Sequence, residues 1–230
     1  MAGYDAVIFD NDGVLIDIEV SDPSIFVDVV REAFEEFGVE PQESEIAEFV
    51  GYAHLDPGKM RSICDRYGVE FEEVWRQREI KSSRIQRREV ENGRSLYDDV
   101  EVVPELDVPV GVVSNNQRKT VEHVLSHFEL DRHVDSLYAR EPTVDAIEKG
   151  KPNTFYLERC IEDLCAETEL CAETDLSGED VIFVGDTETD VMAGNRLGLD
   201  SAYIDRPHTA RIDEEPDVYL DSLYDLPEMV

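Results

Sequence analysis

Short apolar runs alternate along the chain with longer segments in which apolar residues recur every three to four positions. The short runs are typical of buried strands, and the longer segments are typical of amphipathic helices. The runs that we interpret as strands cover residues 6–9, 110–113, 134–138, 181–184 and 201–204. Because strands that alternate with helices form parallel sheets covered on both faces, this order predicts an α/β fold with a Rossmann-like, doubly wound parallel sheet.

The segment between the first two predicted strands carries helical patterns. The run PSIFVDVVREAFEEFG places apolar residues at three-to-four spacing and stops at Gly38. Further helical patterns follow, with Gly51 and Gly68 as breaks. A chain of 230 residues has room for one α/β core and one modest helical insert, which we place at residues 17–94.

Two carboxylates, those of Asp10 and Asp12, follow the first predicted strand in the run FDNDGVLI. Open α/β sheets carry their chemistry at the carboxyl ends of the strands. Residues spaced by two emerge on the same side of a strand, so Asp10 and Asp12 are placed to act as a nucleophile beside an acid/base, while Asn11 is expected to point away. An ordinary polar turn is the alternative, and matching residues farther along the chain decide between the two.

Matching polar residues do follow. Ser114 and Asn115 come directly after the second predicted strand, where we expect a helix to start and to bind phosphate. Lys151 stands just before a proline at the start of another predicted helix. Asp186 follows the fourth predicted strand, and Asp190 comes one helical turn later. The set therefore places hydroxyl, amide, ammonium and carboxylate groups at one edge of the sheet.

This order of motifs, D-x-D, Ser, Lys and G-D-x-x-x-D, resembles the haloacid dehalogenase superfamily of aspartate-nucleophile phosphohydrolases, and the resemblance spans the whole chain. It implies an α/β core of residues 1–16 and 95–230 and a helical cap of residues 17–94 that closes over the site. Lys59, Arg61 and His54 lie near the place where family members carry a specificity loop, although each alone is typical of an exposed charge.

The resemblance also implies a mechanism. Asp10 attacks phosphorus and forms an aspartyl-phosphate, while Asp12 protonates the leaving oxygen and then deprotonates the attacking water. Ser114 and Asn115 donate hydrogen bonds to the transferring group, and Lys151 stabilises its charge. We expect neighbouring carboxylates to raise the pKa of Asp12 toward neutrality.

So many carboxylates repel one another and a phosphate dianion unless a hard cation lies among them, and Mg²⁺ is the expected cofactor. By resemblance, Asp10 and Asp186 bind it through their side chains and Asp12 through its backbone carbonyl. Asp190, the remaining candidate ligand, is expected to lie farther from the ion than these three.

The expected activity is hydrolysis of a small phosphomonoester, such as phosphoglycolate or a sugar phosphate. A β-phosphoglucomutase-like phosphotransferase shares the motifs and the cap. A 2-haloacid dehalogenase fits less well because those enzymes do not use the second acid of the first motif. A receiver-type signalling domain, which is not an enzyme, is expected to be much shorter and to lack the insert.

Acidic residues dominate the composition, with 55 Asp and Glu against 21 Lys and Arg and a formal net charge of −34. At about 1 M salt the Debye length falls to roughly 3 Å, which screens this self-repulsion, so we expect a protein from a salt-accumulating halophile. The charge disfavours nucleic acid as a partner. We expect a monomer or homodimer that binds a small phosphorylated metabolite.

No signal peptide and no apolar run long enough for a membrane span is visible in the sequence, which favours a cytoplasmic protein without a membrane partner. The cysteines, Cys64, Cys160, Cys165 and Cys171, lack the spacing of a zinc site and are expected to be free thiols.

Overall fold

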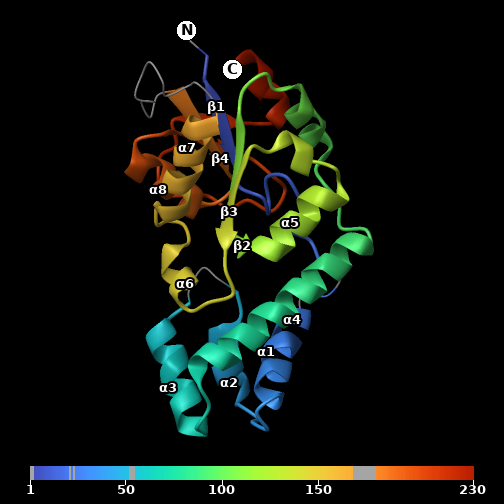
Figure 1. Ribbon diagram of the computed structural model, residues 1–230, viewed down its shortest axis with the longest axis vertical. Helices are drawn as coiled ribbons and strands as arrows, with labels where there is room; N and C mark the ends of the chain where they lie inside the picture. The colour runs from blue at the N-terminus through green and yellow to red at the C-terminus, as the bar shows by residue number, and fades with distance from the viewer. Residues whose placement is uncertain (1–2, 21, 23, 52–54, 168–179) are drawn as a thin grey trace.

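A parallel sheet forms the centre of the protein (Figure 1). The computed structural model describes residues 3–20, 22, 24–51, 55–167 and 180–230. The strands of the sheet lie in the order β3-β2-β1-β4-β5-β6, and every neighbouring pair is parallel. They are β1 (Ala6–Phe9), β2 (Val110–Gln117), β3 (Ser136–Arg140), β4 (Val181–Gly185), β5 (Asp200–Ile204) and β6 (Val218–Leu220). The predicted α/β class with a parallel sheet is confirmed.

The sheet differs from the prediction mainly at β2, β3 and β6. Strand β3 begins two residues later than expected, and the three-residue strand β6 was not predicted. Strand β2 continues to Gln117, with an irregular register against β3 between Ser114 and Gln117. The helix expected directly after residue 113 therefore begins only at Arg118, and Ser114 lies within strand β2 rather than at a helix start.

Helices cover both faces of the sheet. On β1, Val7 and Phe9 face one buried cluster and Ala6 and Ile8 face another, as the two-residue period of a strand requires. Helix α5 (Arg118–His127) and the 3₁₀ helices η2 (Asp98–Glu105) and η6 (Leu223–Glu228) contribute to the first cluster. Helices α7 (Phe155–Glu167) and α8 (Glu188–Leu197) contribute to the second. Burial on both faces is the reason that β1 has no polar residue.

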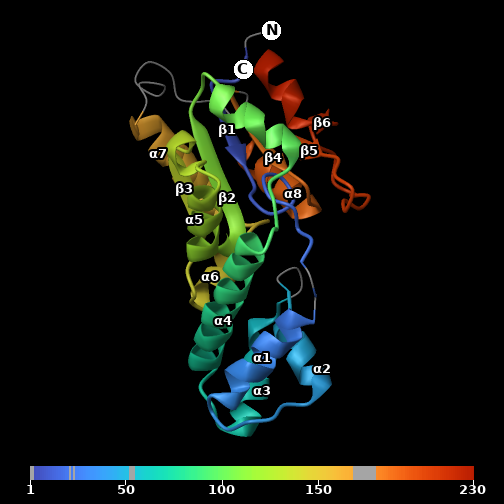
Figure 2. The same ribbon diagram turned by 90° about the vertical axis from the view of Figure 1, so that its right-hand side faces the viewer.

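The remaining helices gather beyond the carboxyl ends of the central strands (Figures 1 and 2). They are α1 (Ile25–Glu35), α2 (Glu43–Ile46), the 3₁₀ helix η1 (Ala47–Phe49), α3 (Pro57–Tyr67) and α4 (Phe71–Glu91). Helices α1 to α4 have their own apolar cluster, in which the rings of Phe34 and Phe49 meet edge to face at 5.2 Å. The short helix α6 (Asp145–Lys149) and the 3₁₀ helix η3 (Asp131–His133) belong to the core segment of the chain. The boundaries of the cap at 16/17 and 94/95 stay a prediction.

Helix α4 joins the helical insert to the sheet. Thr120 Oγ1 donates to Ser83 Oγ at 2.9 Å. Farther along α4, Asn116 Nδ2 donates to Gln86 Oε1 at 2.7 Å. These buried polar contacts fix one wall of the candidate site because hydrogen bonds of this kind are costly to leave unmade.

Among the described cysteines, one differs from its prediction. Cys64 and Cys160 are free and buried, but Cys165 forms a disulfide, so the expectation of a free thiol there is wrong. Cys171 lies outside the described residues. Among the helices of the described ranges, none combines the length and the apolar character that crossing a membrane requires.

Candidate active site

The predicted site residues meet at the carboxyl edge of the three central strands. Asp10 follows β1 and Asp186 follows β4, and the Asp10 backbone N–H donates to the Val184 carbonyl at 2.9 Å. Ser114 lies in the neighbouring strand β2 and is 2% exposed. The sheet order puts β2 and β4 on either side of β1, so the point where the order reverses carries the polar groups.

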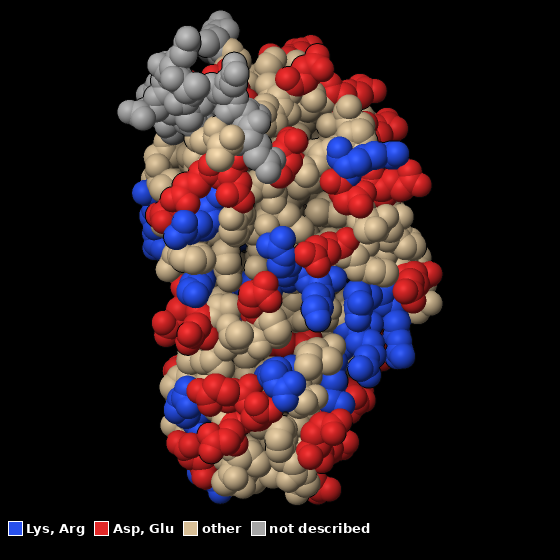
Figure 3. Space-filling view, in the orientation of Figure 1, with Lys and Arg blue, Asp and Glu red and all other residues tan. Residues whose placement is uncertain are grey.

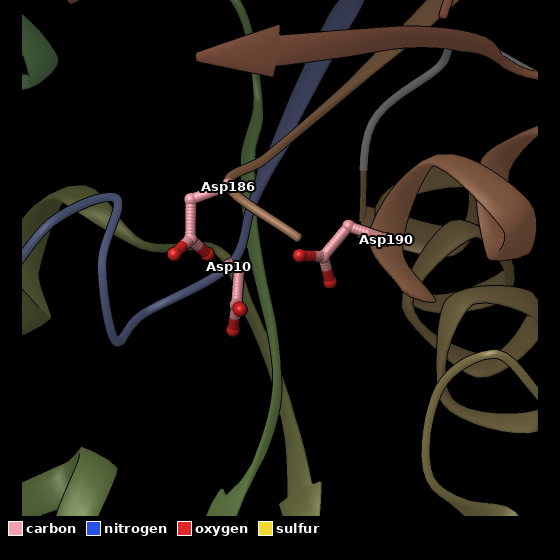
Figure 4. Close-up of side chains that lie close together, drawn as sticks. All are labelled: Asp10, Asp186 and Asp190. Carbon is pink, nitrogen blue, oxygen red and sulfur yellow. The ribbon is translucent and has the colours of Figure 1, made fainter. Parts of the chain in front are cut away.

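Three buried carboxylates, those of Asp10, Asp186 and Asp190, turn toward one another from β1, β4 and α8 (Figure 4). One oxygen of each lies within 4.8 Å of the others. Burial, and then the charge of Asp190, raises the pKa of Asp186 to about 7. Asp186 Oδ1 is buried without a hydrogen-bond partner. A buried oxygen in this position suits a hard cation, which prefers oxygen ligands, so these residues fit Mg²⁺.

Lys151 lies between two of these acids. Its Nζ is 2.9 Å from Asp10 Oδ1 and 2.7 Å from Asp190 Oδ1, and it donates to the Val113 carbonyl at 3.0 Å. The ammonium is therefore held by one hydrogen bond and two buried ion pairs. Burial alone would lower the pKa of Lys151, but the two carboxylates outweigh it and hold the pKa above its ordinary value.

Asp190 and Asn115 hold this lysine in place. Asp190 Oδ2 accepts from the Thr187 backbone N–H at 3.0 Å at the start of α8, while its other oxygen faces Lys151. Asn115 Oδ1 accepts from the Lys151 N–H at 2.7 Å, and Asn115 Nδ2 donates to the Lys151 carbonyl at 3.0 Å. The Asn115 side chain therefore fixes the backbone of Lys151, a contact that the sequence motif did not predict.

Asp12 has partners that its sequence neighbours do not reveal. Its Oδ1 is 2.8 Å from Arg94 Nη2, and its Oδ2 accepts from Asn116 Nδ2 at 2.9 Å. Burial alone would raise the pKa of Asp12, but Arg94 and Asn116 outweigh it and hold the pKa below its ordinary value. The expected raised pKa is therefore wrong. Asn11, expected to point away, donates from Nδ2 to Asp12 Oδ2 at 3.1 Å.

His208 is a second residue that the sequence analysis missed. Its Nε2 lies 2.7 Å from Asp186 Oδ2, and its Nδ1 lies 3.2 Å from the Tyr97 hydroxyl. Burial lowers the pKa of His208, which favours the neutral ring. It follows the last predicted strand by a few residues, outside any motif, so no pattern in the sequence indicated it.

A cavity of about 320 Å³ opens above Asp10, Asp12 and Ser114. The helical insert and the residues beside it supply an apolar part of its wall, formed by Ile18, Val20, Phe26 and Val50, and a polar part, formed by Arg78, Ser82, Gln86 and Arg94. Lys59 and Arg61 are exposed and paired with Glu48 and Glu72, as is typical of surface charges, and neither lines this cavity. His54 lies outside the described residues.

Comparisons with known proteins agree with this arrangement. A family model described as haloacid dehalogenase-like hydrolase matches residues 7–204. Pyrophosphatase PpaX of Bacillus cereus is 24% identical over 229 residues, covering 96% of this chain and 93% of that protein. A structure of a candidate phosphoglycolate phosphatase from Lactobacillus plantarum is similar with a TM-score of 0.65 at 16% identity, covering 100% of both chains. YfnB of Bacillus subtilis, bound to magnesium, has a TM-score of 0.59 at 17% identity, covering 99% of this chain and 98% of that one.

Proposed function

Because the chain belongs to the haloacid dehalogenase-like hydrolase family, we propose that it hydrolyses a small phosphomonoester through an aspartyl-phosphate on Asp10. The family match confirms the resemblance drawn from the motifs and the prediction of a hydrolytic enzyme. The observation that carries the proposal is the placement of Asp10, which is buried, held by Lys151 at 2.9 Å and open to the cavity.

In the first step, an Asp10 oxygen attacks phosphorus and forms a P–O bond while the bond to the leaving oxygen breaks. Asp12 gives the leaving oxygen a proton. In the second step, water loses a proton to Asp12 and attacks the same phosphorus, which releases inorganic phosphate and restores Asp10. The contact with Arg94 favours the ionised form of Asp12 in the free protein, which suits the second step. The negative charge of a bound phosphate favours the protonated form, which suits the first.

Lys151 supplies positive charge that does not need to reorganise during the reaction, because Asp190 and Asn115 already fix it. Ser114 lines the cavity and is available to the transferring phosphoryl group, although its Oγ accepts from the Asn116 backbone N–H at 3.0 Å. In this scheme Asn115 acts by positioning Lys151. One proton of Asn115 Nδ2 is donated to the Lys151 carbonyl, and a direct contact with substrate would use the other.

We infer Mg²⁺ as the cofactor. Asp10 and Asp186 would hold it through their carboxylates and Asp12 through its backbone carbonyl, and the buried Asp186 Oδ1 supports this set. Bound there, the cation would neutralise charge on the phosphoryl oxygens. Asp190 accepts a hydrogen bond from the Thr187 backbone N–H and forms an ion pair with Lys151. It would therefore position the lysine rather than bind the cation directly.

The cavity supports a small substrate such as phosphoglycolate or a sugar phosphate, because its volume of about 320 Å³ is at the small end of the range of roughly 300–1,000 Å³ for ligand pockets. The name of the PpaX relatives adds pyrophosphate to the substrates worth testing. A phosphotransferase of the β-phosphoglucomutase kind uses the same first step, and an isomerised sugar phosphate in place of free phosphate would identify it.

The test is phosphate release from phosphoglycolate, sugar phosphates, nucleotides, pyrophosphate and p-nitrophenyl phosphate at molar salt, with and without Mg²⁺. Asp10→Asn is expected to lose at least about 10³-fold in kcat because the amide is a poor nucleophile. Asp28→Asn, an exposed acid on α1, is the matched control and is expected to keep full activity. Near-normal turnover by Asp10→Asn would rule out the aspartyl-phosphate.

A further inference from the structure

A second, smaller cavity of about 110 Å³ lies where α4, the start of α5 and the end of β3 meet. It touches the stripe of α4 next to the one that faces the active site: Ile80, Ser83 and Arg87 line it, whereas Arg78, Ser82 and Gln86 line the active-site cavity. Its volume is well below the roughly 300 Å³ at which ordinary small-molecule pockets begin, so it fits a small ion or one charged group of a larger molecule.

Two residues that line this cavity each carry a buried donor without a hydrogen-bond partner. Gln117 is 4% exposed, and its Nε2 is buried and unsatisfied. The Arg87 Nε is likewise buried without a partner, and both residues line the cavity. Buried polar groups in native proteins are nearly always paired, so two unpaired donors on one small cavity indicate an acceptor that occupies it.

The backbone adds to this preference. Gln117 is the N-cap of the ten-residue helix α5, and no side chain caps this helix start. The first amide groups of a helix have no partner within the helix, and its dipole favours negative charge at this end. The missing acceptor is therefore expected to be an anion.

The charged side chains around the cavity are also mainly basic. Arg118, Lys119 and Arg140 line it together with Arg87, and Glu141 is the acidic residue among its lining. Arg118 contacts Glu122 at 2.9 Å and Arg140 contacts Glu79 at 3.2 Å, so part of this charge is compensated. Figure 3 shows Lys and Arg side chains gathered over the region of α4 and the start of α5. This is unexpected in a chain with a net charge of −34.

We propose that this cavity is a second binding site, separate from the active site, for a small tetrahedral oxyanion such as inorganic phosphate or the phosphate group of a metabolite. Gln117 Nε2, Arg87 Nε and the amide groups at the start of α5 supply the donors. The guanidinium and ammonium groups around them supply the charge.

The test uses selenate, a tetrahedral oxyanion whose selenium gives an anomalous signal. Crystals of the whole protein soaked in selenate are expected to show a peak in this cavity within hydrogen-bond distance of Gln117 Nε2 and Arg87. In Gln117→Glu, which keeps the size of the side chain but replaces the donor with a negative charge, and in Arg87→Met the peak is expected to disappear. Arg84→Met, an exposed arginine on the same helix that does not line the cavity, is the matched control and is expected to keep it.

Titration calorimetry with inorganic phosphate gives the same comparison in solution. Gln117→Glu is expected to weaken the binding event of this cavity at least about tenfold, since it removes a donor and adds repulsion. The crystal structure of each variant shows whether it is folded. Wild-type crystals without a peak in this cavity, or a peak that persists in both variants, would overturn the proposal. Because a selenate peak beside Asp10 is resolved separately, this result does not depend on the proposed hydrolysis.

Discussion

The Arg94 guanidinium lies 2.8 Å from the Asp12 carboxylate, although 82 positions separate the two residues in the chain. Arg94 also donates from Nε to the Asp17 carbonyl. One side chain thus joins the two ends of the predicted cap to the proposed acid/base. The ionisation of Asp12 therefore depends on how the end of the helical insert is placed.

The first prediction concerns this contact. Arg94→Gln removes the positive charge that holds the pKa of Asp12 down, so that pKa should rise. Asp12 then stays protonated up to a higher pH, so the acidic limb of the kcat profile should shift to higher pH. We expect kcat to fall about 10- to 100-fold. Rates measured from pH 5 to 9 check this, with the exposed Arg88→Gln as the control. An unchanged profile in Arg94→Gln would separate Arg94 from the proton transfer.

The second prediction concerns Lys151. Lys151→Met leaves the carboxylates of Asp10 and Asp190 buried without their cation, and the free energy of unfolding should fall by about 3–5 kcal/mol. The loss should be smaller at pH 5 than at pH 8, because protonation relieves the unpaired acids. Urea unfolding at both pH values measures it.

The control for that experiment is Lys59→Met. Lys59 forms an exposed ion pair with Glu48, so its loss should change the free energy of unfolding by less than about 1 kcal/mol. Equal effects of the two substitutions would show that Lys151 has no special structural role.

The third prediction concerns metal binding. Without a cation the pKa of Asp186 lies at about 7, so the carboxyl must lose a proton before it can act as a ligand below that pH. The apparent affinity for Mg²⁺ should therefore fall as the pH is lowered from 8 to 6, by up to about tenfold for each pH unit below 7. Calorimetric titration with MgCl₂ measures this affinity. An affinity that does not change over this range would exclude Asp186 as a titrating ligand.

The fourth prediction concerns salt. With a net charge of −34, repulsion between acidic groups should destabilise the protein at low ionic strength, where the Debye length is long. We expect the Tm to rise steadily as KCl increases from 0.1 to about 2 M, and activity to rise with it. A Tm that stays constant or falls over this range would contradict the proposed adaptation to a salt-accumulating cytoplasm.

The sequence by itself determined the sheet and the edge that carries the chemistry. Apolar runs such as residues 6–9 are local signals, because a strand that is buried on both faces must be apolar at every position. Because Asp10, Asp12 and Asp186 come directly after such runs, their placement at the carboxyl edge of the sheet followed from where those strands end. The short strand β6 was missed because three residues carry too little pattern.

Only the tertiary structure decided how these groups are paired and charged. The pKa of Asp12 was predicted wrongly from its acidic neighbours because Arg94 and Asn116 come from distant parts of the chain. The contacts of Asn115 with Lys151, and of His208 with Asp186, likewise join segments that share no motif. Electrostatic effects depend on distance and burial in space, and a linear pattern of residues specifies neither until the chain is folded.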